Sequence, residues 1–259
     1  MRNYLNRILI VFLGFLLTLG MGGYETVHGQ SLLSEEDLQT SLGNDKVEEL
    51  LQLLPEGINS KDPMLKLVNK SNPLQEELIF DWAYSDSGLP YNASIQPAYE
   101  AWMEAANQAG YSYQFVSGYR SMEEQKVNRM ARYQSYLSEG VDPDYAQTLV
   151  DKFYAPIDAS EHLTGLALDL LGTDWTSQGG ELTAAYADMA SAQWLDNSGP
   201  DYGFILRYPS DKEAITGYHF EPWHFRYVGE DHAHFMTEHH LTLEEYLSLI
   251  QMKENKTNS

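Results

Sequence analysis

Apolar and polar positions follow two periods along most of the chain, from about residue 62 onward. Apolar residues at helical spacing predict helices at 97–108, 122–138, 143–154, 186–195 and 241–252. Short alternating or continuously apolar runs predict strands at 111–116, 165–171, 203–208 and 218–228. Because helices and strands are intermixed and the later strands lie close together in sequence, the pattern predicts an α+β fold, with a small antiparallel sheet flanked by helices.

The first 29 residues have a different pattern. Arg2 and Arg7 flank the start of an apolar run over residues 8–21. This order is typical of a secretory signal, and the run of 14 residues is shorter than the roughly 20 that a membrane-spanning helix needs. We therefore predict export, with cleavage after Gly29. An uncleaved N-terminal membrane anchor over residues 1–29 is the alternative.

The rest of the chain divides into three segments. Residues 30–61 are polar with two stretches of helical apolar spacing, which predicts a helical or partly ordered N-terminal extension. Within it, Ser34 and Asp37 have the spacing of a capping box. Residues 62–252 form the predicted main domain, and the polar residues 253–259 are expected to fray.

Composition narrows the choice of partners and chemistry. The chain has 38 acidic and 16 basic residues and a net charge of −22, which argues against a nucleic-acid partner. It contains no cysteine, so disulfides, thiolate nucleophiles and cysteine-bound metals are excluded. Any metal must therefore bind to His, Asp and Glu. The sequence also has no glycine-rich phosphate loop and no G-x-S-x-G motif.

The first candidate for chemistry is the segment 160–169. In the predicted strand that begins at Gly165, Asp169 faces away from the leucines that alternate with it, and the small Ala167 leaves space beside it. His162 lies just before this strand, and Gly165 allows the chain to turn so that both side chains approach one point. An exposed Asp169 on an edge strand is the alternative.

The second candidate is the segment 218–227, which places Glu221 and His224 among aromatic residues. An unpaired carboxylate is costly to bury there, and a metal ion would offset that cost. Zinc held by two histidines and one carboxylate, with a fourth position open to water, is common in hydrolases. The candidate ligands are His162, Asp169 and His224, which leaves Glu221 to take a proton from the activated water. A purely structural hydrogen bond between Glu221 and His224 is the alternative.

The remaining histidines are less informative. His219 could face the site or help to bury its own strand. A cluster beyond the predicted strands lies in an acidic stretch, and we expect it to be solvated surface: His232, His234, His239 and His240.

Together, the two segments resemble the VanY-type zinc D-alanyl-D-alanine carboxypeptidases and their relatives, the LdcB-type L,D-carboxypeptidases. The motifs are Ser160-x-His162-x-x-Gly165-x-Ala167-x-Asp169 and Glu221-Pro-Trp-His224. Supporting segments at 67–74, 117–125 and 194–209 match in the same order, so the resemblance covers about residues 62 to 230.

The resemblance implies the zinc D,D-peptidase (hedgehog/DD-peptidase-like) fold and assigns roles to individual residues. It implies zinc on His162, Asp169 and His224, with Glu221 as the catalytic base. It also implies that Arg120, with Gln125 and Ser160, binds the terminal carboxylate of a peptidoglycan stem peptide. A guanidinium suits this task because its planar fork can donate two hydrogen bonds to a carboxylate. The alternative for Arg120 is a surface salt bridge.

Three positions depart from the family pattern. Leu163 replaces the Gln that usually follows the zinc-ligand histidine, and His219 stands where the family often has Tyr. The segment 155–162 lacks the Pro-Gly that is often found there. None of these departures removes a zinc ligand or the base, but they leave the preference for stem peptides open.

From these residues we expect an exported zinc carboxypeptidase that removes a C-terminal D-amino acid, D-Ala, from peptidoglycan stem peptides. Its specificity is D,D or L,D, and its location is extracellular and cell-wall associated, either secreted or membrane-attached at the N-terminus. We expect a monomer, although no motif sets the oligomeric state. The alternatives are a non-catalytic peptidoglycan- or peptide-binding module of the same fold, or a peptidoglycan endopeptidase.

Overall fold

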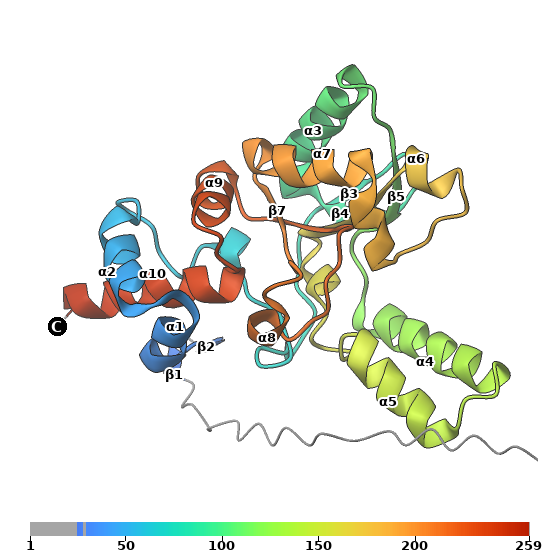
Figure 1. The fold of residues 1–259 in the computed structure, drawn as a ribbon, viewed down its shortest axis with the longest axis horizontal. Coiled ribbons are helices and arrows are strands. Elements are labelled where there is room, and N and C mark those ends of the chain that lie inside the picture. Colours follow the sequence, from blue (N-terminus) through green and yellow to red (C-terminus); the bar gives the residue numbers. More distant parts are fainter. Residues whose placement is uncertain (1–24, 28–29, 259) are drawn as a thin grey trace, which may run out of the picture.

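A four-stranded antiparallel sheet lies at the centre of the fold (Figure 1). In the computed structural model, residues 25–27 and 30–258 are described. The predicted signal run over 8–21 and the cleavage point after Gly29 lie outside the described residues. The strand order is β5-β6-β8-β7, with bounds of Tyr113–Ser117, Ala167–Gly172, His224–Tyr227 and Phe204–Leu206. The predicted α+β class with a small antiparallel sheet is confirmed.

One apolar core covers a face of this sheet. Helices α3 (Gln96–Gln108) and α7 (Ala190–Ser198) contribute to it. Trp102 of α3 stacks on Phe204 of β7, with 4.7 Å between the ring centroids. Leu166, Leu168 and Leu170 are buried in the same cluster. The leucines of the predicted strand therefore face the core, as their alternation predicts.

A second apolar core packs helices near the start of the described chain against helices near its end. Helices α1 (Glu35–Leu42), α2 (Asn44–Leu53), α9 (Glu230–Glu238) and α10 (Leu243–Asn258) bury their apolar faces together. Residues 30–61 therefore contain the predicted short helices, and Ser34 caps α1 by accepting a hydrogen bond from the Asp37 amide. The expected frayed end at 253–259 is instead helical through Asn258, and Glu254 accepts hydrogen bonds from Ser60. The domain boundary at residue 62 stays a prediction.

Helices α4 (Met122–Ser138) and α5 (Pro143–Phe153) form a hairpin that projects from the sheet (Figure 1). A capping box begins α4, because Ser121 and Glu124 exchange side-chain-to-backbone hydrogen bonds. Asp142 caps α5 by accepting hydrogen bonds from the Asp144 and Tyr145 amides, and it precedes Pro143, which is well placed at the first helical position. Local sequence signals thus fix where each helix of the hairpin begins.

Several predicted elements have other bounds in the structure, and β7 covers three residues of the strand predicted at 203–208. The strand predicted at 218–228 is extended only over β8, because Glu221 and Pro222 form a turn closed by a hydrogen bond from the His224 amide. The helix predicted at 186–195 begins only at Ala190, since Met189 is extended and the preceding residues form the short 3-10 helix Ala184–Asp188.

The remaining elements are short. They comprise strands β1 (Glu25–Val27) paired with β2 (Gln30–Leu32), strands β3 (Trp82–Tyr84) paired with β4 (Pro90–Asn92), helices α6 (Thr173–Thr176) and α8 (Glu213–Thr216), and the 3-10 helices Pro63–Leu65, Ala93–Ile95, Glu161–Thr164 and Gly199–Tyr202. Within the part of the chain that the structure describes, no helix combines the length and apolar character needed to cross a bilayer.

Candidate active site

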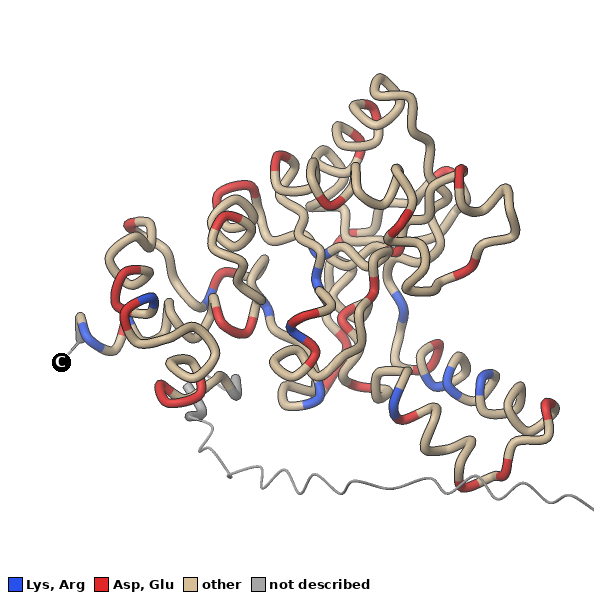
Figure 2. Tube along the Cα trace, viewed as in Figure 1, with Lys and Arg blue, Asp and Glu red and all other residues tan. Residues whose placement is uncertain are grey.

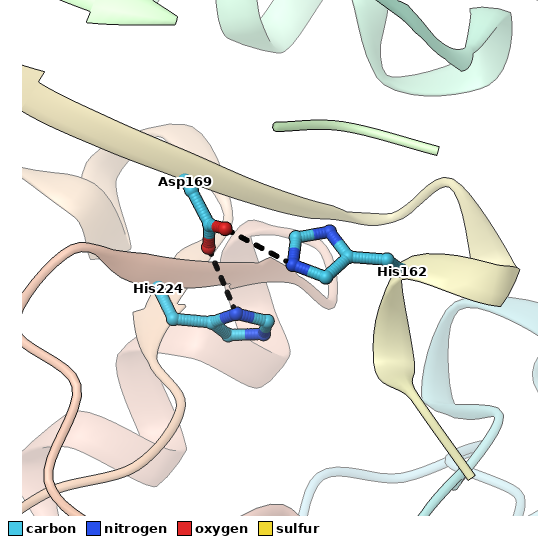
Figure 3. Close-up of side chains that lie close together, drawn as sticks. All are labelled: His162, Asp169 and His224. Carbon is cyan, nitrogen blue, oxygen red and sulfur yellow. Dashed lines mark hydrogen bonds and ion pairs between the residues drawn. The ribbon is translucent and has the colours of Figure 1, made fainter. Parts of the chain in front are cut away.

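Three buried side chains lie close together beside the two interior strands of the sheet, β6 and β8 (Figure 3). Asp169 on β6 and His224 on β8 are directly opposite each other in the strand register, so their side chains share a face of the sheet. His162 reaches the same point from the 3-10 helix that precedes β6. Asp169 Oδ2 lies 3.1 Å from His162 Nε2, and Asp169 Oδ1 lies 3.0 Å from His224 Nδ1. Asp169 is therefore buried on an interior strand of the sheet. The alternative of an exposed Asp169 on an edge strand is wrong.

A sharp turn at Gly165 delivers His162 to this point. Gly165 has a φ of 65°, and its amide donates to the His162 carbonyl oxygen at 3.1 Å. A Cβ at this position would lie 2.7 Å from the Phe80 ring and 2.9 Å from the Asn92 amide nitrogen. The position therefore requires glycine for both its backbone conformation and its close packing.

Replacing Gly165 by alanine is expected to lower the free energy of unfolding and to weaken metal binding through displacement of His162. Gly57→Ala is the matched control, because Gly57 also has a positive φ but its Cβ would meet no atom within 4 Å. We expect Gly57→Ala to cost about 1 to 2 kcal/mol from backbone strain alone. Gly165→Ala should cost about 1 to 3 kcal/mol more, because it adds overpacking. If the two variants lose the same free energy of unfolding in denaturant, the close packing at Gly165 adds no cost and the prediction is contradicted.

Both histidines have their outer ring nitrogens occupied by hydrogen-bond acceptors. His162 Nδ1 lies 2.7 Å from the Gly118 carbonyl oxygen, which can only accept, so Nδ1 carries the proton. His224 Nε2 lies 3.2 Å from Glu161 Oε2 and donates to that carboxylate. The inner nitrogens, His162 Nε2 and His224 Nδ1, face Asp169 and can offer lone pairs to a metal ion. Outer acceptors of this kind orient metal-binding histidines.

The electrostatics of the cluster favour a cation. Burial would lower the pKa of His224, but its hydrogen bonds to Asp169 and Glu161 raise that pKa to about 10. Burial would raise the pKa of Asp169, but His162 and His224 hold it far below its usual value. His224 therefore takes up a second proton when no metal is bound, and this positive charge lies beside the buried carboxylate of Asp169. A metal ion would supply the positive charge in place of that proton. Tetrahedral zinc at about 2.0 to 2.2 Å from each ligand separates ligand atoms by roughly 3.3 to 3.6 Å. Asp169 lies 3.1 and 3.0 Å from the inner nitrogens of His162 and His224, and all three ligand atoms lie within 4.8 Å of one another.

Glu161 is the functional residue that sequence reasoning missed. Its Oε1 accepts hydrogen bonds from Arg207 Nε at 2.8 Å and Arg226 Nη1 at 2.7 Å, and all three side chains are inaccessible to solvent. Burial would raise the pKa of Glu161, but the two arginines lower it well below its usual value, so the residue is ionised and can only accept. A signal was present, since both arginines interrupt apolar strand sequences, where an unpaired charge is not tolerated.

Glu221 lies beside the cluster without joining it. Pro222 favours the turn that links Glu221 to His224, and Glu221 Oε2 lies 3.6 Å from His224 Nδ1. That distance is too long for a hydrogen bond, which argues against a purely structural pair. The side chain is 23% exposed, so the carboxylate remains open to the cavity. Burial raises its pKa to about 7, with a further contribution from Asp169, which suits a group that accepts a proton at neutral pH.

The cluster opens into a cavity of about 390 Å³ that also holds the other predicted site residues. Arg120, Gln125 and Ser160 line it together with Glu221. Arg120 donates to Gln125 Oε1 at 2.7 Å and to Ser117 Oγ at 2.8 Å, and its amide donates to the His162 carbonyl oxygen at 3.2 Å. Among the described residues it forms no ion pair with a carboxylate, so its charge is available to a ligand.

The other histidines separate into two groups. His219 lines the cavity and stacks on Phe153, with 5.0 Å between the ring centroids. The four histidines from 232 to 240 lie on α9 and just beyond it, where His232 is bonded to the Tyr246 hydroxyl. In the described ranges, the group His162, Asp169 and His224 is the single set of three or more residues that could hold a metal ion.

The chain is similar to known proteins. The profile of the VanY family, described as D-alanyl-D-alanine carboxypeptidase, matches residues 90–230. The chain belongs to the VanY family. A D-alanyl-D-alanine carboxypeptidase of Enterococcus faecalis is 31% identical to this VanY-family chain over 209 residues, which are 81% of the chain and 75% of that protein.

Two solved structures extend the comparison for this VanY-family protein. The VanY D,D-pentapeptidase from a VanB-type resistance cassette, crystallised with Zn(II), is 32% identical with a TM-score of 0.63 and covers 72% of this chain and 99% of that one. The LdcB L,D-carboxypeptidase is 28% identical with a TM-score of 0.58 and covers 88% of this chain and 94% of that one. The predicted zinc D,D-peptidase fold is confirmed.

The two side-chain departures from the VanY pattern lie in different places. Leu163 is fully buried in an apolar cluster with Val68 and Leu74 and does not line the cavity. His219 does line it. Of the two substitutions, only the one at His219 can contact a ligand in the cavity.

Proposed function

We propose that this chain is a zinc-dependent carboxypeptidase that removes a C-terminal D-Ala from peptidoglycan stem peptides. The proposal rests on three groups that line one cavity. They are the metal-binding cluster, the partly exposed carboxylate of Glu221, and the guanidinium of Arg120, which forms no ion pair with a carboxylate of the described residues. The family and the zinc-containing VanY structure support the choice of metal and of reaction.

In this proposal, His162 Nε2, a carboxylate oxygen of Asp169 and His224 Nδ1 hold the zinc ion. When bound, zinc would polarise the scissile carbonyl and lower the pKa of water at its open position. Glu221 takes the proton of the attacking water, whose oxygen bonds to the carbonyl carbon. As the C–N bond breaks, Glu221 passes that proton to the leaving amine of D-Ala.

Arg120 supplies the preference for a chain end. Its guanidinium is held by Gln125 and Ser117 and can donate to the free carboxylate of the terminal residue. Ser160, which also lines the cavity and is almost fully buried, is the third predicted contact to that end of the peptide. This arrangement favours removal of one terminal residue over cleavage within a cross-bridge.

We also propose that the protein acts outside the cytoplasm, because its substrate class is found there and residues 1–29 have the pattern of an export signal or anchor. Sequencing of the N-terminus of the exported protein distinguishes the two forms. A first residue at Gln30 indicates cleavage, and a retained Met1 in the membrane fraction indicates an anchor.

Release of D-Ala from synthetic stem peptides tests the proposal. Zinc-loaded protein is expected to release D-Ala from a pentapeptide, a tetrapeptide or both, which separates D,D from L,D specificity by mass spectrometry. Chelation should abolish release and zinc should restore it. No release from either peptide would leave the alternative of a non-catalytic binding module.

Arg120→Ala separates exo- from endo-cleavage in the same assay. We expect about a 100-fold or greater loss of kcat/KM on peptides with a free terminal carboxylate, and little change on the same peptides with an amidated end. An equal loss on both would favour an endopeptidase in which Arg120 has a structural role.

A further inference from the structure

Arg132 is a second cation in the cavity that the proposed reaction leaves without a role. It lies on α4 between Asn128 and Tyr136, which are one turn away on either side, and all three residues line the cavity. The guanidinium carbon lies 4.4 Å from the centre of the Tyr136 ring. This cation–π contact holds the guanidinium beside the Tyr136 ring.

Arg132 and Arg120 differ from the other described arginines because they form no ion pair with a carboxylate. Of the five described arginines, Arg129 pairs with Asp151, and Arg207 and Arg226 pair with Glu161. Among the described residues, Arg120 and Arg132 form no ion pair with a carboxylate, and both line the same cavity. A chain with 38 acidic and 16 basic residues has many carboxylates to offer, so two free guanidinium groups in one cavity indicate an anionic ligand.

The polar atoms of Arg132 are only partly satisfied. Tyr136 shares a hydrogen bond with it, but Arg132 Nε is buried and has no hydrogen-bond partner among the described residues. The nearby Glu139 accepts a hydrogen bond from the Ser135 hydroxyl. Because Arg132 lines the cavity and forms no ion pair with a carboxylate among the described residues, a carboxylate in the cavity would pair with its charge.

The local field at α4 supports an anionic ligand. Figure 2 shows blue segments along α4, which carries Lys126, Arg129 and Arg132, while acidic segments are spread over most of the rest of the fold. A protein of net charge −22 repels an anionic peptide at long range. Lys126 and Arg129 pair with Glu123 and Asp151, so Arg132 is the cation of α4 that reduces this repulsion in the cavity.

The spacing along α4 shows which part of a peptide Arg132 can reach. Gln125, which holds Arg120, and Arg132 are seven residues apart on this helix, a rise of about 10 Å. An extended peptide covers about 10 Å in three residues. A peptide whose end is bound by Arg120 therefore brings a residue two or three positions before the scissile bond to Arg132.

We propose that Arg132 binds a second carboxylate of the substrate, carried by the second or third residue N-terminal to the scissile bond. The inference rests on the proposed carboxypeptidase function. It makes the preferred ligand a dianionic peptide, with one carboxylate at its end on Arg120 and the other upstream on Arg132.

Matched peptides test this inference on the zinc-loaded full chain. The peptides end in D-Ala and differ in one group, a carboxylate or a carboxamide, on the second or the third residue before the scissile bond. For one of these positions we expect the wild-type protein to have a KM at least tenfold lower for the carboxylate peptide. Arg132→Gln should remove that difference by raising KM for the carboxylate peptide, with kcat unchanged, and Arg132→Lys should restore part of it.

Lys126→Gln is the matched control. It removes one positive charge from the same helix, but Lys126 is half exposed, pairs with Glu123 and does not line the cavity. We expect its KM values to stay within about twofold of the wild type at moderate salt. Thermal melting of each variant reports whether the fold is retained.

The outcomes separate this inference from the proposed function. If the wild type releases D-Ala equally well from carboxylate and carboxamide peptides at both positions, the role of Arg132 is overturned and the carboxypeptidase function stands. The same conclusion follows if Arg132→Gln lowers kcat on all peptides alike, which is the signature of a structural role. If the wild type releases nothing from any peptide, both are overturned.

Discussion

Glu221→Gln is expected to reduce kcat for D-Ala release by about 10³-fold, because it removes the group that takes and returns the proton. The amide matches the carboxylate in shape, and Glu221 lies outside the group of three metal-binding side chains. Zinc content and melting temperature should therefore stay close to those of the wild type. Steady-state kinetics together with metal analysis by atomic spectroscopy measure both properties.

Glu123→Gln controls for the loss of one carboxylate elsewhere, since Glu123 is exposed on α4 and pairs only with Lys126. Its kcat should equal that of the wild type. If Glu221→Gln retains more than a tenth of the wild-type kcat, Glu221 is not the base.

Glu161→Gln is expected to destabilise the protein by about 3 to 5 kcal/mol, because it leaves Arg207 and Arg226 as buried charges without their shared carboxylate. It should also weaken zinc binding about 10- to 100-fold, since His224 loses the acceptor that orients its ring. Denaturant unfolding in the presence of chelator gives the first quantity, and zinc titration gives the second.

Glu244→Gln is the matched control for this prediction. Glu244 is also buried and pairs with Arg207 at 2.6 Å, but no contact links it to His224. It should lower stability while leaving zinc affinity unchanged. An equal loss of zinc affinity in the two variants would mean that Glu161 acts on the metal only through general stability.

Because the pKa of Glu161 is low in the folded state, the stability of the wild type and that of Glu161→Gln should depend differently on pH. A carboxyl whose pKa is lower in the folded state contributes stability that is complete above its unfolded value, about 4.5, and is lost as the pH falls below that value. The wild type should therefore lose stability between about pH 5 and pH 3 more steeply than Glu161→Gln.

The chemistry of the site could be predicted from sequence to the extent that it depends on residue type. Without cysteine, a metal is limited to His, Asp and Glu, and only a few such residues lie at strand positions. The alternation of β6 indicated the side of the sheet that Asp169 faces. The same reasoning could not find Glu161, because its partners lie 46 and 65 residues away and only the folded chain brings them together.

Local signals also explain which elements were predicted well. The N-capping residues of α4 and α5 act within one turn of the helix, so the start of each helix follows closely from sequence. The strand predicted at 218–228 was too long because periodicity does not detect the turn at Pro222. The packing of α1 and α2 on α10 depends on contacts across nearly the whole chain and has no local signal.

That packing also determines where the chain can be shortened. A protein that begins at residue 62, the predicted start of the main domain, would lack α1 and α2 and expose the apolar face of α10, including Leu247 and Ile250. Such a face in water favours aggregation. Removal of the C-terminal helix would expose the matching face of α1 and α2. Soluble fragments for crystallisation or binding studies should therefore keep both ends, from about residue 30 through Asn258.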